Sequence, residues 1–222
     1  MEYVLHRVNT LERLRAGIEA GCDRLEVDVR SRRGELLVTH DPPIGPWAVG
    51  VNGVQFSRWA VPAPHWQGRF LRLGELLEEA SLPLLLDLKG TWTDAAFGHL
   101  VRFLAERGRH GDLLASDRWS LFERCRRSAA PLAFVYGLPS HAVSLFLDRL
   151  GSGLAPYAVS MRPRLARSDE LRDRLQRTDI RFYVWAVRVR RELEEFERAG
   201  AAGVIFDDAS WLRGGPSRDG GI

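Results

Sequence analysis

Two acidic residues, Glu26 and Asp28, lie two positions apart within a run of strand-favouring residues. Side chains alternate along a β-strand, so both carboxylates are expected on one face, with Leu25, Val27 and Val29 on the other. A folded protein seldom points two acids into its interior unless something positive lies there. The pattern therefore indicates a functional site rather than an ordinary core strand.

A histidine follows in the next segment of the chain. After a polar break at 31–34, the sequence is strand-like again and ends at His40. A hairpin that turns at Gly34 would set His40 opposite Asp28 to within one residue. We therefore expect Glu26, Asp28 and His40 on one small patch, which is the candidate active site.

Asp87 and Lys89 repeat the two-residue spacing after a run of three leucines. Together with Glu26 and Asp28, Asp87 would complete a three-carboxylate cluster, a hard oxygen site that suits Mg²⁺ or Ca²⁺. Lys89 is the only lysine among the 32 basic residues of the sequence, which favours a role for a compact point charge here. The alternative is an internal salt-bridge network of these acids with Lys89 and Arg7.

Two histidines near strand ends, His6 and His40, would converge on this cluster. A histidine pair beside an acid cluster indicates a general acid and a general base that work near neutral pH. A divalent cation, Lys89 and Arg7 would hold an anion and the charge that develops on it, while the histidines move protons. This combination is typical of phosphoester chemistry.

The elements that must position these residues alternate regularly. Strand patterns occupy eight segments, 3–6, 25–30, 83–89, 113–116, 132–136, 157–161, 181–187 and 203–207. Helical patterns separate them, and Asn9 is expected to cap the first helix with Glu12 as its capping-box partner. The alternation predicts an α/β fold, a parallel (β/α)8 TIM barrel whose chemistry lies where strands end. The residues at or near such ends are His6, Asp28, Asp87, Lys89, Trp185 and Asp207.

Length and composition fit a single barrel domain over residues 1–213. The 222 residues are 45% hydrophobic, enough for a large core. Residues 41–72, rich in Pro, Gly and Trp, are expected to form a short inserted loop region, and residues 214–222 a disordered tail. Cys22 and Cys125 are too few and too far apart for a disulfide scaffold or a zinc site.

Charge and hydropathy exclude several classes of partner. The net charge is +3, but the basic residues are spread along the chain without a compact cluster, which argues against nucleic-acid binding. No apolar run approaches the roughly 20 residues of a membrane span. The first residues lack a basic region and an apolar signal core, so a cytoplasmic location is expected.

Six short motifs occur in an informative order. They are His6-Arg7, Glu26 with Asp28, His40-Asp41, Asp87 with Lys89, and the segments 183–187 and 203–208. In this order they resemble the glycerophosphodiester phosphodiesterases of the phospholipase-C-like phosphodiesterase superfamily, over residues 5–208. The resemblance implies a distorted eight-stranded barrel and a set of roles: metal ligands at Glu26, Asp28 and Asp87, an acid/base pair at His6 and His40, and phosphate contacts from Arg7 and Lys89.

The sequence departs from the family pattern at three places. Val8 replaces a glycine and the loop at Asn9 is several residues shorter than in the family. Asp87 stands where most of the family has glutamate, a feature closer to the sphingomyelinase-D-like enzymes. The insertion after His40 is short. The resemblance also implies that Trp185 forms an aromatic wall beside the alcohol moiety of the substrate, and core filling is the alternative role.

These observations lead to one main hypothesis and three alternatives. The main hypothesis is a phosphodiesterase that uses Mg²⁺ or Ca²⁺ to hydrolyse a glycerophosphodiester or a related small phosphodiester, with His6 and His40 as acid and base in either order. One alternative is a sphingomyelinase-D-like phospholipase that forms a cyclic phosphate. Another is a non-catalytic barrel that binds a phosphorylated ligand, and a third, nucleic-acid binding, lacks a basic cluster to support it.

Overall fold

The computed structural model describes residues 1–41, 43–44, 47–48, 70–125, 132–151 and 156–213. The expected inserted loop at 41–72 lies largely outside the described residues. The expected tail at 214–222 lies wholly outside them.

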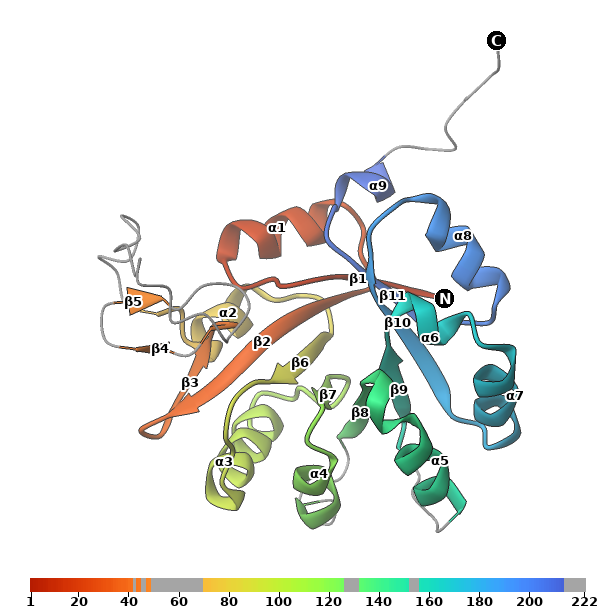
Figure 1. Ribbon diagram of the computed structural model, residues 1–222. Helices are drawn as coiled ribbons and strands as arrows, with labels where there is room; N and C mark the ends of the chain where they lie inside the picture. Colours follow the sequence, from red (N-terminus) through yellow and green to blue (C-terminus); the bar gives the residue numbers. More distant parts are fainter. Residues whose placement is uncertain (42, 45–46, 49–69, 126–131, 152–155, 214–222) are drawn as a thin grey trace.

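Eight parallel strands form a closed barrel (Figure 1). Their bounds are β1 (Glu2–Leu5), β2 (Arg24–Arg32), β6 (Leu84–Leu88), β7 (Leu113–Ser116), β8 (Ala133–Leu138), β9 (Ala158–Met161), β10 (Arg181–Val187) and β11 (Gly203–Phe206). Each pairs with the next, and β1 closes the circle by pairing with both β2 and β11. Because each strand overlaps a segment expected from the sequence, the TIM-barrel prediction is confirmed.

The hairpin after β2 forms as expected. Strand β3 (Glu35–Val38) runs antiparallel to β2, with Val38 opposite Val29. The next residue, Thr39, donates its backbone N–H to the Asp28 carbonyl at 2.9 Å, so His40 lies one residue beyond the position opposite Asp28. The turn needs positive φ at Arg33 (50°) and Gly34 (82°), and glycine adopts this conformation at no steric cost.

Helices surround the barrel (Figure 1). The longer ones are α1 (Leu11–Glu19), α2 (Leu73–Glu79), α3 (Asp94–Ala105), α4 (Trp119–Cys125), α5 (Val143–Gly151), α7 (Asp169–Arg177) and α8 (Arg191–Arg198). Shorter elements are the β4–β5 pair (Pro43–Ile44 with Trp47–Ala48), η2 (Ser140–Ala142), α6 (Pro163–Ala166) and α9 (Ser210–Arg213). None of the described helices combines the length and hydropathy needed to cross a membrane.

The cap expected for α1 is wrong. Thr10, not Asn9, is the N-cap residue, and its hydroxyl accepts from the Arg13 backbone N–H at 3.1 Å. Both residue types favour this position, so the local sequence did not separate them. Asn9 is engaged elsewhere, in the site described below.

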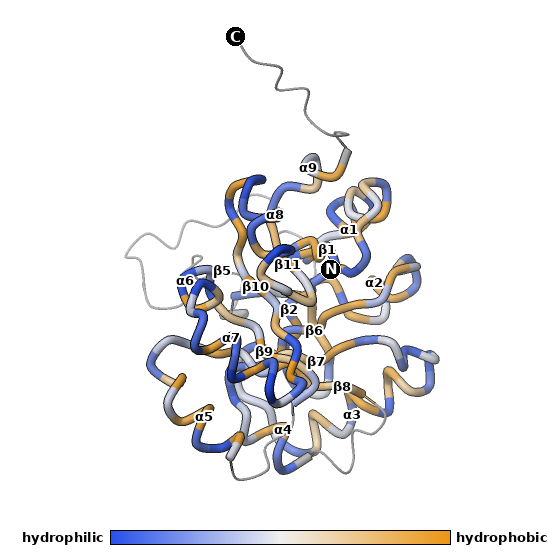
Figure 2. The backbone as a smooth tube through the Cα atoms, turned by 90° about the vertical axis from the view of Figure 1, so that its right-hand side faces the viewer, coloured by the Kyte–Doolittle hydropathy of each residue, from blue (hydrophilic) through white to orange (hydrophobic). Residues whose placement is uncertain are grey.

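The hydrophobic core has two layers. The larger lies between the outer faces of the strands and the helices, where hydrophobic residues recur along each element (Figure 2). The smaller fills the barrel interior and comprises Val4, Leu85, Leu113, Ala115, Val135, Ala158, Tyr183 and Ile205. It leaves the carboxyl ends of the strands to polar residues, as the TIM-barrel architecture predicts.

Candidate active site

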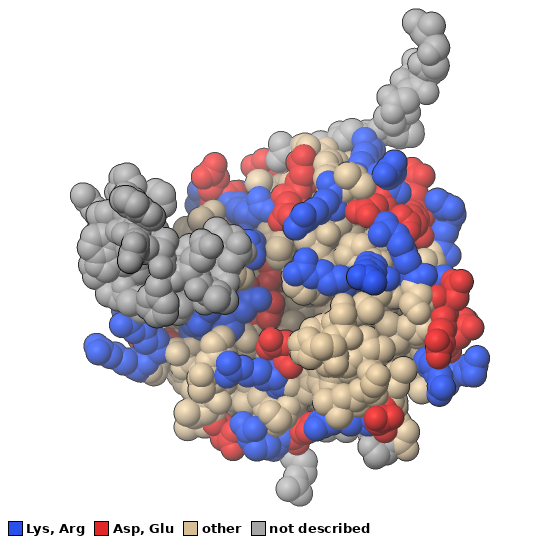
Figure 3. Space-filling model, in the orientation of Figure 1, with Lys and Arg blue, Asp and Glu red and all other residues tan. Residues whose placement is uncertain are grey.

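A cavity of about 470 Å³ opens at the carboxyl ends of the barrel strands. Figure 3 shows a hollow near the centre of the face drawn there, with acidic atoms beside it and basic side chains on either side. The residues expected from the sequence that line the cavity are His6, Arg7, Glu26, His40, Asp87, Lys89 and Trp185. The eighth, Asp28, lies buried beside them at 1% exposure.

The three carboxylates come together. Glu26 and Asp28 share one face of β2, and Asp87 stands directly opposite Asp28 on the neighbouring strand β6. One oxygen from each of the three lies within 4.8 Å of the others. Two ligand oxygens on one Mg²⁺ or Ca²⁺ are about 4–5 Å apart at most, so this spacing fits a single cation.

Asp28 itself shows why a cation fits. Its Oδ2 accepts from the Asn9 side-chain N–H at 2.7 Å, and its backbone N–H donates to Asn9 Oδ1 at 3.0 Å. Its Oδ1 is buried and makes no hydrogen bond among the described residues. Its charged neighbour, Lys89 Nζ at 3.3 Å, lies closer to Asp87, so a further cation would satisfy this buried oxygen better.

Lys89 supplies the positive charge nearest to the cluster. Its Nζ lies 2.5 Å from Asp87 Oδ2 and 3.3 Å from Asp28 Oδ1. Burial alone would lower the pKa of Lys89, but the charges of Asp87, Asp28 and Glu26 outweigh burial and raise it. The Arg7 side chain does not join this ion-pair network, in contrast to the salt-bridge alternative considered above; only its backbone N–H does, donating to Glu26 Oε2 at 2.5 Å.

One lysine does not compensate three acids. Burial raises the pKa of Glu26 well above its ordinary value, and the neighbouring Asp28 and Asp87 raise it further. Burial raises the pKa of Asp87 as well, against the opposing charge of Lys89. The cluster therefore holds excess negative potential, which a divalent cation would neutralise.

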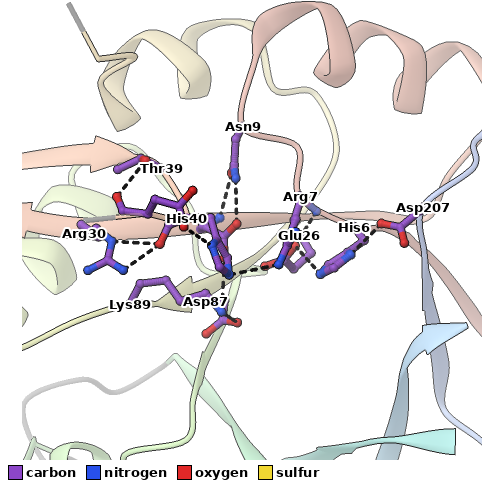
Figure 4. A network of polar contacts seen from close by, with 12 residues as sticks. His6, Arg7, Asn9, Glu26, Arg30, Thr39, His40, Asp87, Lys89 and Asp207 are labelled. Carbon is purple, nitrogen blue, oxygen red and sulfur yellow. Dashed lines mark hydrogen bonds and ion pairs between the residues drawn. The ribbon is translucent and has the colours of Figure 1, made fainter. Parts of the chain in front are cut away.

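The two histidines stand beside the cluster, each held by an acid, and Figure 4 shows His6 with its partner Asp207. His6 Nδ1 lies 2.8 Å from Asp207 Oδ1, and its Nε2 lies 3.9 Å from Glu26 Oε2. Burial lowers the pKa of His6, and the Asp207 carboxylate opposes that effect. The carboxylate partner fixes the ring orientation and favours the tautomer with its proton on Nδ1.

His40 is held in the same way. Its Nδ1 lies 3.0 Å from Asp41 Oδ1, and its Nε2 lies 3.1 Å from Arg7 Nη2. A guanidinium can only donate, so Nε2 accepts in this arrangement. Arg30 also holds the backbone of His40, because its Nη2 donates to the His40 carbonyl at 2.7 Å.

Three residues that support the site were not expected to do so from the sequence. Asn9 clamps Asp28 at both its backbone and its carboxylate. Asp207 and Asp41 orient the histidines. Asp207 could have been found because it ends a barrel strand, and Asp41 because it follows His40 directly. No local signal distinguished Asn9 from a helix cap.

Comparisons with known proteins place the fold. No protein-family model and no curated protein matches this chain. The chain is similar to a glycerophosphodiester phosphodiesterase from Thermotoga maritima, with 19% identity, a TM-score of 0.73 and coverage of 96% of this chain and 97% of that one. It is similar to one from Agrobacterium tumefaciens at 17% identity and a TM-score of 0.69, covering 96% and 98%.

A third similar structure is an Oleispira antarctica phosphodiesterase in complex with the product sn-glycerol-3-phosphate. It shares 16% identity with this chain at a TM-score of 0.65, covering 96% of this chain and 95% of that one. At these identities the likeness confirms the TIM-barrel fold over nearly the whole chain.

Proposed function

We propose that this protein is a divalent-metal-dependent phosphodiesterase that hydrolyses glycerophosphodiesters or a related small phosphodiester. The observation that carries the proposal is the joint placement of three carboxylates within 4.8 Å of one another and two acid-held histidines at one barrel mouth. Structures of similar fold that are named as glycerophosphodiester phosphodiesterases support it.

Glu26, Asp28 and Asp87 would hold the metal, and Asn9 keeps Asp28 in place for that task. When bound, Mg²⁺ or Ca²⁺ would supply Lewis-acid stabilisation of the negative charge that develops on the phosphoryl oxygens. Lys89 and Arg7 line the same cavity and would bind the phosphate oxygens.

His6 and His40 would move the protons. Their carboxylate partners hold Nδ1 of each ring, which leaves the two Nε2 atoms to exchange protons with the attacking and leaving oxygens. His40 Nε2, already an acceptor toward Arg7, and His6 Nε2 would serve as base and acid in either order.

Turnover of glycerophosphodiesters with Mg²⁺, Ca²⁺ or Mn²⁺, and with EDTA, tests the proposal. We expect activity that EDTA abolishes and that falls in Asp28→Asn and His40→Ala by roughly 10²-fold or more. Arg15→Ala, which removes a surface ion pair with Glu79 far along the sequence, is the control and should leave activity unchanged. Activity indifferent to EDTA and to both substitutions would disprove the proposal.

The reaction product distinguishes hydrolysis by water from attack by a hydroxyl of the substrate. Asp87 in place of glutamate favours one second candidate, attack by a substrate hydroxyl that yields a cyclic phosphate. Phosphorus NMR separates a cyclic phosphate from an open monoester. Calorimetry that detects metal and phosphodiester binding without any product over hours would instead indicate a non-catalytic binding barrel.

A further inference from the structure

The cavity has a second polar wall opposite the carboxylates. In barrel order, β9 lies four strands from β2 in either direction, so the two strands face each other across the mouth. Ser160 and Arg162 follow the two-residue period at the end of β9, and Trp185 stands on the adjacent β10. All three line the cavity, and we call Ser160, Arg162 and Trp185 the distal wall.

Ser160 contributes a hydroxyl to the lining of the cavity. Its exposure is 7%, and its hydroxyl makes no hydrogen bond with any residue that the structure describes. Because this hydroxyl faces the cavity, it can donate to or accept from a ligand that binds there. The Trp185 indole N–H, a donor only, likewise has no acceptor among the described residues.

Arg162 is the charged member of the distal wall. Its guanidinium carbon lies 4.1 Å from the centroid of the Trp185 ring, and it forms no ion pair within the described ranges. Stacking holds the planar guanidinium in place while its N–H groups remain available, which is a typical arrangement for binding a carboxylate or a phosphate. Asp117 and Arg118, also at this mouth, are adjacent and opposite in sign, so they leave the charge of Arg162 uncompensated.

The cavity therefore has basic side chains on two sides. Arg7 and Lys89 lie on the side of the metal ligands and serve the phosphodiester, whereas Arg162 lies across the cavity from them. The distal wall would present a cation and two neutral donors to whatever group the phosphodiester carries on that side.

We propose that the distal wall binds a second anionic group, a carboxylate or a phosphate, on the alcohol moiety of the substrate. This inference rests on the proposed function and names the substrate class. The wall disfavours a quaternary ammonium group such as choline, because the Arg162 guanidinium already stacks on the Trp185 ring and repels a second positive charge.

Four matched substrates test the inference. Glycerol is joined through the phosphodiester to choline, to glycerol, to glycerate or to glycerol phosphate, so the alcohol is cationic, neutral, a carboxylate or a phosphate. We expect kcat/KM to be about tenfold or more higher for at least one anionic ester than for the neutral one, the gain of one charge-assisted contact. The choline ester should be the poorest, and the glycerate and phosphate esters show which anion fits.

Substitutions at Arg162 test whether the preference for anionic esters arises from the distal wall. Arg162→Ala should raise KM for the anionic esters about tenfold, and by much less for the neutral ester, which has no negative charge for Arg162 to bind. Arg162→Glu should reverse the order in favour of choline. Arg164→Ala is the matched control, because this exposed arginine on α6 does not line the cavity.

The outcomes separate this inference from the proposed function. Turnover of all four esters at equal efficiency, or an anion preference that survives Arg162→Glu, would overturn the inference and leave the phosphodiesterase proposal intact. If no ester is turned over with any metal, calorimetry with the same compounds decides. Tighter binding of the anionic esters to the wild type than to Arg162→Glu supports the distal wall, and equal binding overturns it.

Discussion

The two ends of the barrel both contain charged side chains, but the balance of positive and negative charge differs between them. At the amino ends of the strands, Arg24 donates to Glu2 at 3.0 Å and to the carbonyls of Leu84 and Gly111 at 3.1 and 3.0 Å. Tyr183 donates its hydroxyl to Glu2 at 2.9 Å. One cation faces one anion here, and the buried guanidinium has acceptors on several sides.

The carboxyl ends contain the opposite arrangement. Three acids face one lysine, and Asp28 Oδ1 makes no hydrogen bond within the part of the chain that the structure describes. Strand β2 contributes to both ends from one face, with Arg24 at its start and Asp28 four residues later. Balanced, fully bonded charges thus stabilise the barrel, whereas unbalanced ones indicate the site of chemistry.

The largest expected effect is on activity at the carboxyl end. Glu26→Gln keeps the size of a buried side chain but removes one carboxylate of the cluster. We expect kcat/KM to fall by roughly 10²–10³-fold, the range found when one group that stabilises developing charge is removed. Steady-state kinetics at saturating metal measure the loss. Activity equal to the wild type would mean that this acid is structural, like those at the other end.

The converse effect is expected at the amino end. Arg24→Ala removes a buried guanidinium that binds the half-buried Glu2 and two backbone carbonyls, so the free energy of unfolding should fall by about 2 kcal/mol. Activity per folded molecule should stay within about twofold, because Arg24 lies at the far end of the barrel. Urea unfolding and kinetics on the same preparation test both halves. A large loss of kcat without loss of stability would contradict a purely structural role for the amino end of the barrel.

A smaller effect is expected for the acid that holds His6. Asp207→Asn keeps the shape of the side chain but removes the charge that favours a proton on Nδ1. Substitutions of such supporting groups lower activity by about 10–100-fold. A pH–rate profile distinguishes positioning from a merely structural role, since only loss of the carboxylate should shift the limb assigned to His6. The Asp41→Asn variant provides the parallel test for His40.

The smallest effect concerns the pH dependence of metal-free stability. The pKa of Glu26 is raised in the folded protein, so the folded state holds this proton more tightly than the unfolded chain does. The free energy of unfolding should therefore fall as pH rises from about 4.3, the unfolded value, toward the raised folded pKa. Urea unfolding in EDTA, with wild type and Glu26→Gln compared at each pH, isolates this contribution. Parallel profiles would contradict it.

Much of the candidate site was predictable because strand geometry is local. Alternation alone put Glu26 and Asp28 on one face, and Asp87 with Lys89 on another. Parallel strands in a barrel end at the same mouth, so the order of eight strands was enough to expect the two pairs together. The hairpin at Gly34 placed His40 within one residue because its turn is short and depends on nearby residues.

The remaining features depend on contacts across long stretches of chain. Asn9 meets Asp28 across 19 residues, and His6 meets Asp207 across 201. Arg162 and Trp185 meet only because β9 and β10 are neighbours. No periodicity in a sequence encodes which of two adjacent capping residues turns inward or which arginine stacks on a ring.

The sequence by itself determined the barrel, the shared faces of its acids and the type of chemistry they favour, since these follow from side-chain alternation and strand order. The tertiary structure alone decided that Asp28 Oδ1 makes no hydrogen bond with the described residues, that each histidine is held by an acid, and that a second polar wall faces the first. These facts depend on burial and side-chain direction, which are fixed only when distant segments pack together.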